Sequence, residues 1–163
     1  MKSLLVVYHS MTGAAEQLAL AAAAGAKTQH DIEVRVCRAR DAESIDLLAA
    51  DGYLFATPEN LATMAGLMKD FFDRVYYAVL ERVNGRPYAA IVAAGTDGAG
   101  AARQLQRIAT GLRLREVAPP LVVRNGAQTP AEILAPKIVP PAYLQTARDL
   151  GTALAAGIAA GIF

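Results

Sequence analysis

Segments typical of β-strands alternate with segments typical of α-helices along the whole chain. Three strand segments, 3–8, 52–56 and 88–94, are almost continuously apolar, which is typical of parallel strands covered by helices on both faces. Segment 32–36 alternates apolar and charged residues and segment 117–123 contains two prolines, so we expect both at sheet edges. Helical patterns occupy the residues between them: 13–27, 44–49, 65–80, 99–111 and 143–160. This alternation predicts an α/β fold with a mostly parallel sheet.

We therefore expect a single domain over residues 1–163, built as a three-layer sandwich around a five-stranded parallel sheet. The edge and centre signals favour the strand order 2-1-3-4-5, in which the order reverses between the first and third strands. Ligands of such sheets bind beyond the carboxyl ends of the strands at that point. A proline-containing loop is expected between the last strand and the last helix.

Composition narrows the functional classes. Apolar residues make up 54% of the chain, charged residues 19%, and the net charge is +1, which gives no electrostatic case for a nucleic-acid partner. Cys37 is the single cysteine, so no internal disulfide is expected. The sequence carries no recognisable signal peptide and no apolar run of membrane-spanning length. We expect a cytoplasmic protein with no membrane partner.

Small and polar residues follow each of the three central strands. The first strand ends in Ser10-Met11-Thr12-Gly13-Ala14-Ala15, the third in Thr57-Pro58-Glu59-Asn60-Leu61-Ala62-Thr63-Met64, and the fourth in Gly95-Thr96-Asp97-Gly98-Ala99-Gly100. Such loops allow a ligand to approach the backbone closely. The first also opens a helix, whose N–H groups and positive dipole end favour a phosphate. The residues offer no metal-ligand spacing and no nucleophile with a base, so we expect no metal and name no catalytic side chain.

These loops carry a family resemblance. Over the whole chain, the sequence resembles flavodoxin-like NAD(P)H-dependent FMN reductases, the group that includes the tryptophan-repressor-binding-protein type of quinone reductase. The most specific stretch is Gly52-Tyr53-Leu54-Phe55-Ala56-Thr57-Pro58-Glu59-Asn60, followed by Lys69-Asp70-Phe71-Phe72-Asp73-Arg74. It resembles the family's G-T-P segment and the K-x-F-x-D-R of its next helix. The resemblance implies a flavodoxin-like fold, FMN as cofactor and NAD(P)H as co-substrate.

The resemblance also implies which residues bind the cofactor. The FMN phosphate would be held by Ser10, Met11, Thr12, Gly13, Ala14 and Ala15. The isoalloxazine ring would lie along Pro58, Glu59, Asn60, Leu61 and Met64, with Gly95, Thr96, Asp97 and Gly98 on its other side. Glu59 would be the carboxylate near the ring, interpreted first as a solvated loop residue and second as a charge that tunes the flavin.

The implied activity is that of an oxidoreductase that passes hydride from NAD(P)H, through FMN, to a quinone, free flavin or similar small acceptor. Two departures from the family pattern keep alternatives open. Ala14-Ala15 stands where a hydroxyl residue is common, and no aromatic residue lies in the ring-flanking loops. The alternatives are a flavodoxin-type electron carrier and a binding module with weak or lost FMN binding. A homodimer or homotetramer is possible, because relatives often form one.

Overall fold

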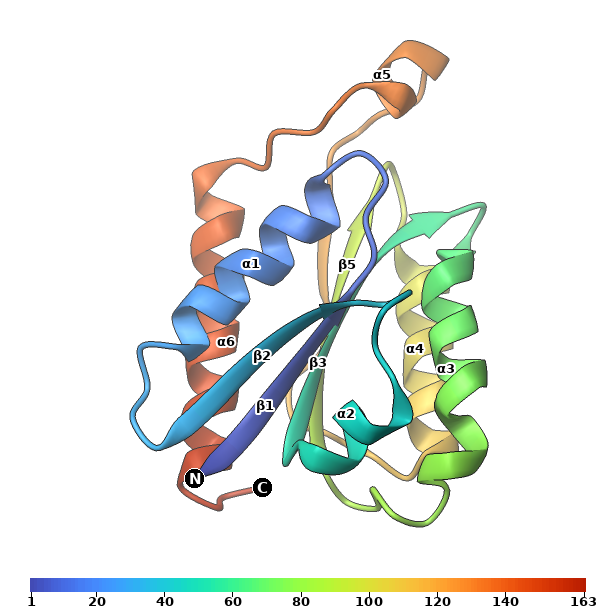
Figure 1. Cartoon of the computed structure of the whole chain (residues 1–163). Coiled ribbons are helices and arrows are strands. Elements are labelled where there is room, and N and C mark those ends of the chain that lie inside the picture. The colour runs from blue at the N-terminus through green and yellow to red at the C-terminus, as the bar shows by residue number, and fades with distance from the viewer.

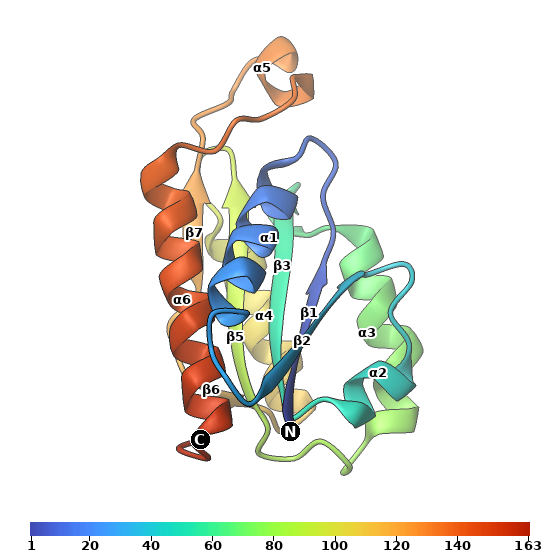
Figure 2. The same ribbon diagram turned by 60° about the vertical axis from the view of Figure 1, so that its left-hand side comes forward.

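The computed structural model describes residues 1–163 and confirms a flavodoxin-like α/β fold (Figure 1). The strands are β1 (Lys2–Tyr8), β2 (Ile32–Arg38), β3 (Gly52–Asn60), β4 (Thr63–Met64), β5 (Pro87–Ala94), β6 (Arg115–Glu116) and β7 (Leu121–Arg124). The helices are α1 (Ala14–Ala26), α2 (Ser44–Ala49), α3 (Gly66–Val79), α4 (Ala99–Gly111), α5 (Pro130–Leu134) and α6 (Pro141–Ala159). Helices cover both faces of the central sheet, α1 and α6 on one side and α2, α3 and α4 on the other (Figure 2).

The sheet has the order β2-β1-β3-β5 and ends in β6 and β7, which both pair with β5. All of these pairs are parallel. This is the expected order, with one correction: the fifth strand predicted over 117–123 is two short strands. Pro119 and Pro120 separate them, because proline has no N–H to donate to the neighbouring strand. The edge positions of β2 and of β6 and β7 are as expected.

A second correction concerns β4, a two-residue strand that sequence patterns did not indicate. It pairs antiparallel with the end of β3, so β3 runs to Asn60, four residues beyond the predicted end of the strand. A third concerns the loop expected before the last helix, which contains α5. Thr129 caps this helix by accepting a hydrogen bond from the Glu132 N–H at 3.3 Å, in a capping box followed by Pro130.

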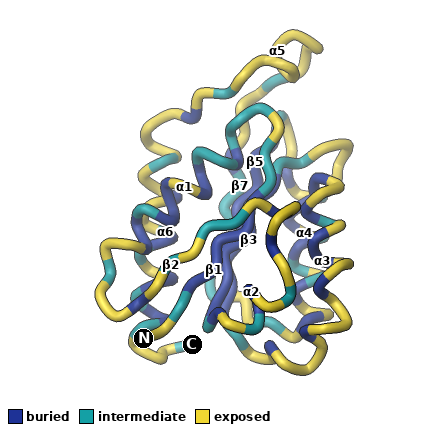
Figure 3. The backbone as a smooth tube through the Cα atoms, viewed as in Figure 1, coloured by how far each residue is buried: buried dark blue, intermediate teal, exposed yellow.

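The alternation of side chains along the strands divides the core into two parts. Leu5 and Val7 of β1 face α2, α3 and α4, whereas Leu4 and Val6 face α1 and α6. Figure 3 shows the central strands as continuously buried, while α5 stands out from the carboxyl edge of the sheet as an exposed segment. No helix combines the length and the apolar character needed to cross a bilayer.

Candidate functional site

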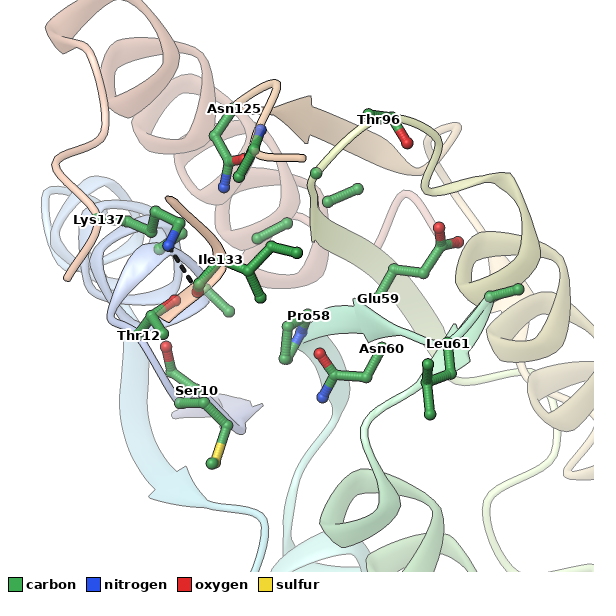
Figure 4. Close-up of a pocket in the computed structure, with 18 residues that line it drawn as sticks. Ser10, Thr12, Pro58, Glu59, Asn60, Leu61, Thr96, Asn125, Ile133 and Lys137 are labelled. Carbon is green, nitrogen blue, oxygen red and sulfur yellow. Dashed lines mark hydrogen bonds between the residues drawn. The ribbon is translucent and has the colours of Figure 1, made fainter. Parts of the chain in front are cut away.

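A cavity of about 530 Å³ opens at the carboxyl edge of the sheet, where β1, β3 and β5 end (Figure 4). Its volume falls in the range of about 300–1,000 Å³ that is typical of small-molecule sites. Four segments line it: Ser10, Met11, Thr12, Ala14 and Ala15; Pro58, Glu59, Asn60, Leu61 and Ala62; Ala93, Ala94, Gly95 and Thr96; and Asn125, Ala127, Ile133 and Lys137. The first three segments are the loops that sequence analysis singled out.

The first loop ends in an uncapped helix. Gly13 precedes α1 with φ of 101°, a left-handed conformation that glycine adopts without strain, and its N–H donates to the Ser10 hydroxyl at 3.1 Å. No side chain caps α1, and the N–H groups of Ala14, Ala15 and Glu16 donate to no acceptor in the chain. Free N–H groups and the positive end of the helix dipole therefore meet at this end of the cavity, which is the chemistry that binds a phosphate.

The second loop is a tight hairpin between β3 and β4. Its two central residues, Leu61 and Ala62, have φ of 51° and 66°. A two-residue hairpin turn of this kind needs positive φ at both positions, and residues other than glycine, asparagine or aspartate are strained there. The Leu61 side chain is 99% exposed at the rim of the cavity. The hairpin therefore presents an apolar side chain to solvent beside the cavity at a cost in backbone strain.

Glu59 has a different role from the one expected. Its Oε1 accepts a hydrogen bond from the Gly98 N–H at 2.8 Å, and its Oε2 accepts one from the Ala101 N–H at 3.0 Å. The carboxylate thus caps the N-terminus of α4, where it satisfies free N–H groups and complements the helix dipole. Glu59 lines the cavity, yet its charge is bound within the protein, so the interpretation as a solvated loop carboxylate is wrong.

Four of the residues expected at the cofactor lie outside the cavity lining: Gly13, Met64, Asp97 and Gly98. Met64 is 3% exposed and packs into the core with α3 and α4, because alternation along β4 turns Thr63 outward and Met64 inward. Gly98 is buried below its loop with φ of 91° and caps the start of α4. The Asp97 carbonyl accepts a hydrogen bond from Arg124 Nε at 2.6 Å, and its side chain is exposed.

Sequence analysis missed the fourth segment, which follows β7. The Asn125 N–H donates to the Ala94 carbonyl at 3.0 Å and the Gly126 N–H to the Gly95 carbonyl at 2.8 Å, so this segment continues the pairing of β7 with β5. Farther along, the Lys137 N–H donates to the Thr12 carbonyl at 2.7 Å. A signal was present: the last predicted strand belongs to a mostly parallel sheet, so the loop after it must emerge at the same edge as the other three loops.

A glutamine on α1 joins this segment to the first loop. Gln17 Nε2 donates to the Lys137 carbonyl at 2.8 Å, and Gln17 Oε1 accepts from the Val139 N–H at 3.0 Å. Within α5, the Glu132 carboxylate accepts the N–H groups of Gln128 and Thr129, and these bonds hold the pKa of Glu132 below its ordinary value. Side-chain bonds at both ends therefore order a segment that contributes little to the core.

The residues around the cavity fit FMN. One end presents the free N–H groups of α1 to a phosphate. The remainder is lined by alanine, glycine, proline and aliphatic side chains, against which a flat ring can lie, together with the polar side chains of Asn60, Thr96 and Asn125. No aromatic residue is among the lining residues, and Glu59 and Lys137 are the charged ones. An aromatic side chain would stack on a ring; here Met11, Leu61 and Ile133 take that place at the rim.

Known structures confirm the fold. A flavodoxin, WrbA-like protein from Agrobacterium tumefaciens aligns with a TM-score of 0.73 at 19% identity, covering 97% of this chain and 98% of that one. A flavodoxin from the domain Archaea aligns with a TM-score of 0.77 at 19% identity, covering 96% and 98%. Rubredoxin oxygen:oxidoreductase from Desulfovibrio gigas aligns with a TM-score of 0.80 at 13% identity, covering 99% of this chain and 37% of that one.

Sequence relatives indicate the chemical class. A flavodoxin from Aquifex aeolicus is 32% identical over 100 residues, covering 61% of this chain and 54% of that protein. An NAD(P)H dehydrogenase (quinone) from Acidithiobacillus ferrooxidans is 34% identical over 94 aligned positions, covering 45% and 47%. The chain thus matches about half the length of these two relatives. The profile of the family described as NADPH-dependent FMN reductase matches residues 4–129. The chain belongs to the NADPH-dependent FMN reductase family.

Proposed function

We propose that this protein, with FMN in the cavity, takes hydride from NADH or NADPH and passes electrons to a quinone or another flat, apolar acceptor. The observation that carries the proposal is the apolar, non-aromatic character of the cavity rim. No aromatic residue lines the cavity, and the side chains of Met11 and Leu61 are 76% and 99% exposed around its opening. A second flat molecule can therefore approach the cofactor from solvent against an apolar surface.

FMN, when bound, supplies the hydride and electron chemistry. The chain's own residues bind and orient. The N–H groups of Ala14 and Ala15 would hold the phosphate, and the backbone of 58–62 and 93–96 would flank the ring. The Glu59 carboxylate holds the loop after β3 against the loop after β5, because it accepts hydrogen bonds from N–H groups at the start of α4. No side chain at the cavity is required to give or take a proton.

The test is an assay of NADH and NADPH oxidation by FMN-loaded protein, with and without a water-soluble quinone, against free FMN at the same concentration. We expect nucleotide oxidation that depends on the quinone and exceeds the free-FMN rate. If dithionite reduces the loaded protein but neither nucleotide does, the activity proposed here is wrong.

That second outcome would support an electron carrier, the other function that an observation favours. The relative from Aquifex aeolicus is named a flavodoxin. The near-neutral chain, with a net charge of +1, offers less electrostatic steering toward a charged protein partner, so we rank this function second.

A further inference from the structure

The cavity contains one basic residue, Lys137, and it comes from a part of the chain that the family profile does not match. The profile ends at residue 129, before α5 begins. Lys137 is half-buried and forms no ion pair with any carboxylate. The other charged residue of the lining, Glu59, is bound to the start of α4. Lys137 is therefore the one cation of the cavity lining, and no carboxylate pairs with it.

Six hydrogen bonds fix the position of Lys137 and its neighbours. Its ammonium donates to the carbonyls of Glu132 at 2.7 Å, Ile133 at 3.0 Å and Ala135 at 2.6 Å, at the C-terminal end of α5. Its backbone N–H donates to the Thr12 carbonyl at 2.7 Å, and Gln17 binds both its carbonyl and the following Val139 N–H. Figure 4 shows Lys137 beside Ile133 and Thr12, at the end of the cavity where α1 begins.

The start of α1 lacks the hydroxyl side chains that would compensate a phosphate. Ala14 and Ala15 offer only backbone N–H groups, and the helix dipole supplies the equivalent of roughly half a positive charge. A phosphate monoester carries about −1.5 to −2 charges near pH 7. The Lys137 ammonium makes its hydrogen bonds at an exposed part of the segment, so salt screens its attraction to a phosphate.

We propose that Lys137 supplies positive charge to the phosphate of FMN and so offsets the missing hydroxyl groups of Ala14-Ala15. This inference rests on the proposed use of the cavity for FMN. The three N–H groups of the ammonium already have carbonyl partners, so its contribution is electrostatic attraction across the phosphate end of the cavity rather than a necessary hydrogen bond. Lys137 thereby distinguishes FMN from flavins that carry no phosphate.

The experiment compares the affinity of four proteins for FMN and for riboflavin, which lacks the phosphate, by quenching of flavin fluorescence. The proteins are the unaltered chain, Lys137→Met, Lys137→Arg and the control Lys27→Met. Lys27 is exposed at the far end of α1, about 20 Å from the phosphate end, so its removal changes the net charge equally. Each titration is repeated at low and high NaCl, and thermal unfolding checks that each variant is folded.

We expect Lys137→Met to weaken FMN binding about tenfold, which corresponds to ~1.4 kcal/mol, and to leave riboflavin binding within twofold. Lys137→Arg and Lys27→Met should each remain within about threefold of the unaltered protein. Salt should weaken FMN binding to the unaltered protein more than to Lys137→Met, because screening acts on the removed attraction.

Two results would overturn the inference. Equal losses of FMN and riboflavin affinity in Lys137→Met would show that Lys137 only orders the segment after β7. Unchanged FMN affinity would show that it does not act on the phosphate. Should Lys137→Met fail to fold, the unaltered protein decides: equal salt dependence for FMN and riboflavin contradicts the proposal. If the unaltered protein binds neither flavin, the proposed function itself fails, and this outcome is distinct from the other two.

Discussion

The carboxylate of Glu59 accepts a hydrogen bond from the backbone N–H of Gly98 at 2.8 Å, across 39 positions of sequence. This contact joins the end of β3 to the start of α4, and the second carboxylate oxygen extends it to the Ala101 N–H at 3.0 Å. The loops after β3 and β5, which both line the cavity, are therefore positioned by one side chain that caps the N-terminus of α4. The arrangement makes the stability of the fold and the shape of the site depend on the same side chain.

We expect Glu59→Ala to lower the free energy of unfolding by about 1–2 kcal/mol, because α4 loses its cap and the favourable charge at its dipole. Urea denaturation followed by circular dichroism measures this change. The matched control is Asp73→Ala, which removes an exposed carboxylate paired with Lys69 at 2.7 Å and should cost less than ~1 kcal/mol. Equal losses in the two variants would contradict the capping role.

The same helix packs closely on the hairpin. A Cβ atom added at Gly100 would lie inside van der Waals contact of the Ala62 carbonyl oxygen, whereas one added at Gly111 would meet nothing within 4 Å. We expect Gly100→Ala to destabilise the protein by about 1–3 kcal/mol and to weaken FMN binding, because α4 or the hairpin must shift. Gly111→Ala should be neutral or stabilise by up to roughly 1 kcal/mol, as alanine favours helix. Thermal unfolding that ranks the pair in the opposite order would refute the packing argument.

Gln17 holds the segment after β7 to α1 through the Lys137 carbonyl and the Val139 N–H. We expect Gln17→Ala to increase amide hydrogen exchange in residues 125–139 at least several-fold, with little change in β1 or β5. The reason is that few contacts other than those of Gln17 hold this segment to the rest of the protein, so their loss lets it open locally. Peptide-resolved hydrogen-exchange mass spectrometry measures this. Gln29→Ala, at the far end of α1, is the control, and similar exchange in the two variants would argue against the link.

The buried hydroxyl of Tyr53 should make the free energy of unfolding fall at alkaline pH. Its ring is fully buried, its hydroxyl donates to the Leu47 carbonyl at 2.8 Å, and burial raises the pKa of that hydroxyl despite the nearby Arg86 guanidinium. Above pH ~10 the unfolded chain ionises this tyrosine while the folded protein keeps it protonated, so the free energy of unfolding falls as the pH rises.

Tyr53→Phe removes that titration. We expect it to cost about 1–2 kcal/mol near neutral pH, because the hydroxyl's bond to the Leu47 carbonyl and its bond from Arg86 are both lost. We also expect a shallower decline in stability between pH ~9 and pH ~11. Urea midpoints measured across this range give both quantities. Parallel pH profiles for the two proteins would show that Tyr53 does not titrate differently on unfolding.

The fold could be predicted because its main signals are local. The apolar runs of β1, β3 and β5 and the alternation of β2 fix which strands are central and which lie at an edge. Pro119 and Pro120 mark the break between β6 and β7, where the sequence pattern predicted one interrupted strand and the structure has two. A two-residue strand such as β4 leaves no periodic signal, because its pairing depends on the strained turn at Leu61 and Ala62.

Part of the candidate site could be predicted from the sequence and part could not. Loops that follow predicted strands could be placed at one edge of the sheet, and the structure brings Ser10, Pro58 and Gly95 together around the cavity. The role of Glu59 could not be predicted, because capping by a residue 39 positions away is a tertiary contact. Lys137 was missed because a loop rich in proline gives no periodicity, and its position depends on bonds to Thr12 and Gln17.

The most direct test of FMN binding in the cavity is the stoichiometry of the bound cofactor. The purified protein is incubated with excess FMN, separated from free cofactor by gel filtration, and its visible spectrum is compared with its protein content. We expect retained flavin bands at close to one FMN per chain. Absence of retained flavin, together with no quenching of FMN fluorescence during titration, would contradict it and would leave a flavodoxin-like fold that has lost its cofactor.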